Sequence, residues 1–161
     1  MDETFDIRPA RLSEAPVIVT HRRRMFEDMG YTDRDRLTEQ SAAFAVWLRE
    51  RLENGRYRGW FAAAPGGAIA AGAGLWLMDW PPGPMGAAPF RGYILNVYTE
   101  PAFRRCGLAR RLVQTIIEWC YAQGITAISL HASDQGRPVY ETLGFEPTNE
   151  MRLFKPNAPA G

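Results

Sequence analysis

The chain of 161 residues has little cysteine, almost no net charge and no long apolar run. Its two cysteines, Cys106 and Cys120, form no Cys-x-x-Cys motif, so we expect no disulfide framework or zinc ribbon and a reducing, cytoplasmic setting. The formal net charge of +1 predicts no bulk attraction to nucleic acid or membrane. No apolar run approaches the ~18 residues of a membrane span. The acidic N-terminus is unlike a secretory leader.

Two common phosphate-binding motifs and a metal-binding pattern are also missing. No Lys-Ser/Thr pair follows Gly107, which excludes a P-loop for nucleoside triphosphates, and the chain has no Gly-x-Gly-x-x-Gly turn. His21 and His131 stand apart from any second ligand, so no metal site is predicted.

The composition that is present predicts one folded domain. Hydrophobic residues make up 46% of the chain, which is normal for a globular protein. We assign residues 1–155 to a single domain and expect 156–161 to be a disordered tail.

The stretch from Gly92 to Gln123 predicts a strand, a tight basic turn and a helix. Residues 93–99 are rich in strand-forming side chains, and Pro101 cannot donate to a sheet, so the strand should end near it. After Gly107, apolar residues recur at helical spacing as two adjacent rows, which predicts one buried stripe. The rows are Leu108, Leu112, Ile116 and Trp119, and Ala109, Val113, Ile117 and Cys120.

The start of this helix has the properties of an anion site. The first N–H groups of a helix have no partner inside it, and the helix dipole adds partial positive charge there. Gly107 and the small Ala109 let a ligand come close to the backbone, while Arg104 and Arg105 add two full charges. The turn therefore favours a phosphate or pyrophosphate.

The remaining elements predict an α/β (α+β) fold with a mixed central sheet of about six to seven strands and about four helices. Expected strands cover 5–8, 57–64, 68–80, 93–99, 126–131 and 151–154, and expected helices cover 13–29, 37–53, 108–123 and 136–143. The 126–131 strand should pair in parallel with the 93–99 strand through the intervening helix.

Two blocks resemble the GNAT-type N-acetyltransferases. Arg104-x-x-Gly107-x-Ala109 is similar to the Gln/Arg-x-x-Gly-x-Gly/Ala signature, and Tyr140 with Gly144-Phe145 is similar to a second family motif. In the second motif, Ser133 stands where relatives often carry asparagine. The element order resembles the GNAT fold over nearly the whole chain.

The resemblance implies that acetyl-coenzyme A binds along the central strand and the turn. It places the pyrophosphate at Arg104, Arg105, Cys106, Gly107, Leu108, Ala109 and Arg110, and the pantetheine at Val97, Tyr98, Thr99 and Ser133. Main-chain N–H groups of the central strand would also stabilise the oxygen of the thioester. The resemblance further implies that Tyr140 contacts the coenzyme as the general acid that protonates the departing thiolate.

Three residues are candidates for the group that deprotonates the amine. Glu27 lies on the first helix, Asn96 is a polar residue in the apolar centre of the main strand, and Asp79 ends a hairpin strand. If the strand is regular, Asn96 shares a face with Ile94 and Tyr98 and can aim at the acceptor or order a water. We take Glu27 and Asn96 with Tyr140 as the candidate catalytic residues.

These expectations make the chain an enzyme that moves an acetyl group from acetyl-coenzyme A to a primary amine by direct attack in a ternary complex. The alternative is a non-catalytic acyl-coenzyme A sensor or interaction domain on the same fold. The acceptor is a small-molecule or protein amine, and a homodimer is left open. Nucleic-acid binding through Arg22, Arg23 and Arg24 is disfavoured because three consecutive helical residues point in different directions.

Overall fold

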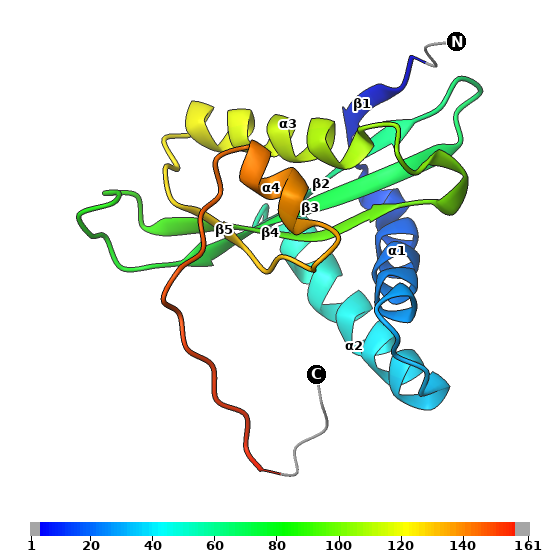
Figure 1. Ribbon diagram of the computed structural model, residues 1–161, viewed down its shortest axis with the longest axis horizontal. Coiled ribbons are helices and arrows are strands. Elements are labelled where there is room, and N and C mark those ends of the chain that lie inside the picture. The colour runs from blue at the N-terminus through cyan, green and yellow to red at the C-terminus, as the bar shows by residue number, and fades with distance from the viewer. Residues whose placement is uncertain (1–3, 157–161) are drawn as a thin grey trace.

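The computed structural model describes residues 4–156, which form a five-stranded sheet in the order β1-β2-β3-β4-β5 with helices on both faces (Figure 1). The strands are β1 (Asp6–Pro9), β2 (Tyr57–Ala63), β3 (Ile69–Asp79), β4 (Phe90–Thr99) and β5 (Ile128–Leu130). The α-helices are α1 (Ala15–Asp28), α2 (Arg34–Glu53), α3 (Leu108–Ala122) and α4 (Arg137–Thr142), with short 3-10 turns at Leu12–Glu14 and Pro101–Phe103. None of these helices is both long and apolar enough to span a bilayer.

The sheet is mixed, as predicted. Neighbouring strands are antiparallel from β1 to β4, and β4 pairs in parallel with β5. The connection between β4 and β5 runs through α3, which is the expected crossover unit.

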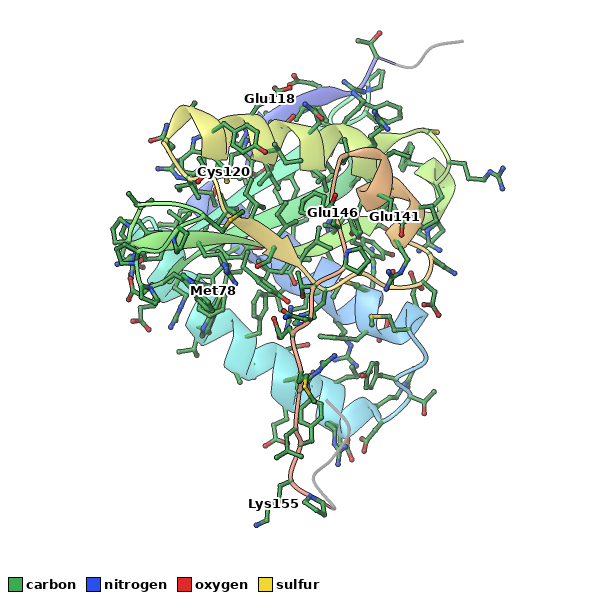
Figure 2. The ribbon with its side chains drawn as sticks, turned by 60° about the vertical axis from the view of Figure 1, so that its left-hand side comes forward. Met78, Glu118, Cys120, Glu141, Glu146 and Lys155 are labelled. Atoms are coloured by element: carbon green, nitrogen blue, oxygen red, sulfur yellow. The ribbon has the colours of Figure 1, made fainter. Side chains whose placement is uncertain are left out.

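Two apolar clusters hold helices to the two faces of the sheet. On one face, the predicted stripe of α3 is buried against the sheet together with Tyr140 of α4. Cys120, labelled in Figure 2, belongs to this stripe, and its sulfur would lie 3.3 Å from a Cβ placed on Gly92. On the other face, Ile18 of α1 and Leu48 of α2 pack with Tyr57 and Phe61 of β2.

The ends of the first two helices differ from the prediction. The first helix was expected over 13–29, but Ser13 lies within a 3-10 turn, where the Glu14 carboxylate accepts from the Arg11 N–H at 2.8 Å, and α1 begins at Ala15. The second helix begins at Arg34 because the Asp33 side chain caps it, accepting from the Arg36 N–H at 3.0 Å.

The prediction of six to seven strands was wrong, because residues 151–154 do not join the sheet. Met151 is 94% exposed and Leu153 is 93% exposed, so the segment buries almost none of its apolar surface on this chain. After α4 the chain runs past the edge of the sheet, and Lys155 lies far from it (Figure 2). The part of the expected tail from 157 to 161 lies outside the described residues.

A β-bulge interrupts β4. Gly74 of β3 lies opposite Leu95 and Gly72 lies opposite Tyr98, so Asn96 and Val97 together face one residue of β3. Gly74 also makes room for Tyr57, because a Cβ at this position would lie only 1.9 Å from the Tyr57 hydroxyl. The bulge and the packing of Tyr57 therefore depend on the absence of a side chain at Gly74.

We predict that Gly74→Ala lowers the free energy of unfolding by about 1–3 kcal/mol, because the new methyl group displaces the buried Tyr57 ring. Urea unfolding followed by circular dichroism measures the change. The control is Gly83→Ala, where a Cβ meets no atom within 4 Å. Equal stability of the two variants would contradict the prediction.

Candidate active site

Strands β4 and β5 are paired at one end only. The pairing covers Gly92–Ile94 of β4 and Ile128–Leu130 of β5, and β4 continues to Thr99 without β5 beside it. The main-chain groups of 95–99 on this side therefore have no strand partner among the described residues, and an extended ligand could add there as a further strand. Val97, Tyr98 and Thr99, which were predicted to bind the pantetheine, lie in this stretch.

Asn96 holds the bulge in a left-handed conformation. Its φ is 56°, and its side chain is buried, with 4% exposed. The amide nitrogen donates to the Tyr57 hydroxyl at 2.9 Å, and the amide oxygen accepts from Arg22 at 2.6 Å. Burial raises the pKa of Tyr57 to about 12, so its hydroxyl stays protonated.

The bulge also changes which residues share a face. Ile94 and Val97 pack with the α3-side cluster, whereas Leu95, Asn96 and Tyr98 face α1 and α2. The expectation that Asn96 shares a face with Ile94 assumed a regular strand and was wrong.

The turn before α3 leaves its amides available. Arg105 has a φ of 65° and Gly107 a φ of 71°, and these two left-handed residues turn the chain into the start of α3. The first intrahelical bond is from the Arg111 N–H to the Gly107 carbonyl at 3.1 Å, which leaves the N–H groups of Leu108, Ala109 and Arg110 without a partner inside the helix. Cys106 is exposed beside them.

The three arginines of this region have different roles. Arg104 donates to the Thr99 carbonyl at 3.0 Å and to Asp28 at 2.5 Å, so it fastens the turn to β4 and α1. Arg110 donates to the Thr142 hydroxyl at 2.7 Å and connects α3 with α4. Arg105 is exposed and has no hydrogen-bond or ion-pair partner in residues 4–156, so its charge is free to meet a ligand.

Ser133 and Tyr140 come together around Gly136. The Ser133 hydroxyl accepts from the Gly136 N–H at 3.1 Å, and a Cβ on Gly136 would lie 2.8 Å from the Tyr140 ring. The ring is buried with Ile94 and Leu108, whereas the hydroxyl has no hydrogen-bond partner among the described residues. Burial raises the pKa of Tyr140, so the phenol is protonated at neutral pH.

The structure places the two predicted carboxylates in ion pairs at the surface. Glu27 is 45% exposed and accepts from Arg23 at 3.1 Å, while Asp79 is 84% exposed and accepts from Arg56 at 2.9 Å. Within residues 4–156, no hydrogen bond or ion pair joins either carboxylate to Asn96 or Tyr140.

His131 is a candidate that the sequence reasoning missed. It directly follows β5, whose last residue, Leu130, pairs with Ile94, two residues before Asn96. Its Nδ1 shares a hydrogen bond with the Tyr93 hydroxyl, and its Nε2 lies 3.9 Å from Glu150. A signal existed in the sequence, because ligands bind beyond the carboxyl ends of parallel strands and His131 follows the strand predicted to be parallel.

Glu100 was also missed. It follows β4, with one carboxylate oxygen 2.5 Å from Arg24 and 3.5 Å from His21, and the other 3.5 Å from the Tyr98 hydroxyl. His21 is buried, with 3% exposed, and burial lowers its pKa. Glu100 therefore forms a polar cluster with Arg24, His21 and Tyr98 at the end of β4 that β5 leaves unpaired. Within residues 4–156, no group of three or more His, Cys, Asp or Glu side chains is arranged to hold a metal ion.

Comparisons with known proteins agree with this geometry. The fold is similar to a GCN5-related N-acetyltransferase from Ralstonia eutropha JMP134, with a TM-score of 0.87 and 35% identity over 94% of this chain and 99% of that one. It is also similar to a predicted acetyltransferase from Clostridium acetobutylicum crystallised with acetyl-CoA, with a TM-score of 0.85 and 28% identity over 94% of this chain and 96% of that one.

A curated relative matches over a shorter stretch. Glucosamine 6-phosphate N-acetyltransferase of Trypanosoma brucei brucei is 33% identical over 63 residues, which are 38% of this chain and 43% of that protein. The match therefore spans less than half the length of this relative. The model of the acetyltransferase (GNAT) family matches residues 20–145, most of the chain, and the protein therefore belongs to the GNAT acetyltransferase family.

Proposed function

We propose that this protein transfers an acetyl group from acetyl-coenzyme A to a primary amine by direct attack in a ternary complex. The observation that carries the proposal is the stretch of β4 beyond Ile94 that β5 leaves unpaired, together with the shared apolar cluster of Ile94, of Leu108 at the start of α3 and of Tyr140. The unpaired amides of β4, the first amides of α3 and the Tyr140 hydroxyl each suit a different part of a thioester donor.

The residues present fit the donor. The N–H groups of Leu108, Ala109 and Arg110, with the Arg105 side chain, suit two linked phosphates. The main chain of Val97, Tyr98 and Thr99 suits the amides of the pantetheine. Arg104 fastens the turn to β4 and α1, and Cys106 and Gly107 are part of this turn. The Ser133 hydroxyl holds the Gly136 N–H, and Gly136 lies against the Tyr140 ring. The acetyl-CoA-bound relative from Clostridium acetobutylicum supports the same choice of donor.

Acetyl transfer from a thioester to an amine requires three contributions from the protein. An ammonium has no lone pair, and removing its proton at pH 7 costs about 4–5 kcal/mol for an amine of pKa ~10.4. The neutral amine then attacks the thioester carbonyl, and a strand N–H near the bulge stabilises the negative oxygen. The C–S bond breaks, and Tyr140 donates its proton toward the leaving sulfur.

We favour His131 as the group that takes the proton of the amine. Histidine is the most common general base in proteins, and His131 directly follows β5, where the pairing with β4 ends. Asn96 has no basic atom at neutral pH, and its bonds to Tyr57 and Arg22 suit it to hold the bulge. Glu27, which is paired with Arg23 near the solvent, is the second choice.

We predict that Arg105→Ala weakens binding of acetyl-coenzyme A about tenfold, because one charge-assisted contact to phosphate is worth about 1–2 kcal/mol. Calorimetric titration measures the change. Arg49→Ala is the matched control, since it removes an exposed arginine of α2, on the other face of the sheet. If wild-type protein binds no acetyl-coenzyme A at millimolar ligand, the proposed function fails.

We predict that Tyr140→Phe lowers kcat for amine-dependent thiol release by about 10²-fold or more, with an unchanged Kd for acetyl-coenzyme A. The change removes only the hydroxyl and keeps the buried ring. An unchanged kcat would contradict the role of Tyr140 as the general acid. Donor binding without thiol release for any amine of a broad panel would instead favour the non-catalytic sensor.

We predict that His131→Gln removes the acidic limb of the pH profile of kcat/KM. The base works when it is deprotonated, so the wild-type rate should rise with pH as the base loses its proton and then level off. Glu27→Gln is the comparison, and it should keep the limb. The reverse result, with the limb lost only in Glu27→Gln, would assign the base to Glu27.

A further inference from the structure

Arg22 is an inward-facing cation without an anion. Within residues 4–156, seven other arginines have a carboxylate within ion-pair distance, namely Arg8, Arg23, Arg24, Arg51, Arg56, Arg104 and Arg137. The hydrogen bond of Arg22 goes to the neutral amide of Asn96 at 2.6 Å, and no carboxylate of residues 4–156 pairs with it. This is unusual, because removing a charge from water costs several kcal/mol unless an opposite charge compensates.

Aromatic rings hold the guanidinium in place. Its central carbon lies 4.8 Å from the centre of the Phe26 ring on α1 and 4.6 Å from the centre of the Phe44 ring on α2. These contacts stabilise a cation and fix its plane. A planar guanidinium has five N–H donors, so the one bond to Asn96 leaves donors for a second partner.

A hollow between α1 and α2 borders the same side chain. The hollow is shallow: it opens to solvent, and its enclosed space is about that of a single water molecule. The lining consists of Arg22, Arg23, Gln40 and Ser41 with the apolar Val19, Phe26, Leu37 and Phe44, and it includes no carboxylate. The charge of Arg23 is met by Glu27, whereas the charge of Arg22 is not met by any of these residues. A ligand group that complements the positive charge of this surface is an anion.

The position of Arg22 connects it with the chemistry. Asn96, its hydrogen-bond partner, is the bulge residue where β4 leaves β5. An anion held by the guanidinium would therefore lie a short distance from the strand amides proposed to receive the thioester. Helix α1 lies directly against β4 on this face (Figure 1).

We infer that the acceptor is an amine that also carries an anionic group, a carboxylate or a phosphate, which binds the Arg22 guanidinium between Phe26 and Phe44. This inference rests on the proposed acetyl transfer and specifies the class of its acceptor. The amine and the anion must be separated by only a few bonds, because Arg22 and Asn96 are in contact.

The test compares matched acceptors in the thiol-release assay. One pair is an amino acid and its uncharged amide, and the other is an amino sugar phosphate and the same amino sugar without phosphate. We expect wild-type kcat/KM to be at least tenfold higher for the anionic member of one pair, mainly through KM. The pair that shows the preference identifies carboxylate or phosphate as the group that is bound.

Variants of two neighbouring arginines separate recognition from general charge. Arg22→Gln should remove most of the anion preference, and Arg22→Lys should restore part of it because the charge returns without the planar fork. Arg23→Gln, which lowers the charge of the same hollow equally, should keep it. Equal rates for both members of each pair in the wild type, or an unchanged preference in Arg22→Gln, would overturn the inference.

An inhibition measurement on the wild-type protein makes the test independent of folding defects in the variants. Inorganic phosphate and acetate should inhibit wild-type acetyl transfer competitively with the amine, and the better inhibitor should match the preferred acceptor pair. Turnover of neutral amines without such inhibition would refute the inference while leaving acetyl transfer intact. Absence of acetyl-coenzyme A binding would instead refute the proposed function.

Discussion

The left-handed bulge at Asn96 is the constraint on which the site depends. A residue other than glycine in this conformation costs about 1–2 kcal/mol. Two buried hydrogen bonds, from Asn96 to Tyr57 and from Arg22 to Asn96, offset that cost. Because Tyr57 needs the space above Gly74, the shape of β4 is set by packing within the protein. The separation of β4 from β5 is therefore present before any ligand binds.

Helix α1 connects the bulge at Asn96 with the turn that precedes α3. Successive contacts join the helix to the chain from the bulge onward: Arg22 to Asn96, Arg24 to Glu100, and Asp28 to Arg104. On the opposite face, the stripe of α3 fixes the helix whose amino end faces the turn. The strand thus lies between two helices with separate tasks in the proposed reaction, in which α3 would position the donor and α1 would border the approach of the acceptor.

The parts that local sequence determines were predicted well, and the parts that distant contacts determine were not. The stripe of α3 and the turn at Gly107 follow from helical spacing and from one left-handed glycine. The direction of Asn96 could not be read, because it depends on Tyr57, 39 residues away. Residues 151–154 have the composition of a strand, but composition does not supply a strand partner. His131 looked isolated because Tyr93 and Glu150 approach it only in the folded chain.

Pairing Arg22 with an anionic acceptor would also assist the chemistry. A carboxylate or phosphate within a few bonds of an amine stabilises the ammonium form and raises the pKa of the amine. At about 4 Å and an effective dielectric constant near 20, one such charge is worth about 4 kcal/mol, nearly the whole cost of deprotonation at pH 7. A guanidinium that neutralises the anion removes most of this penalty. Arg22 would then orient the acceptor and, from the same contact, make its nitrogen easier for His131 to deprotonate.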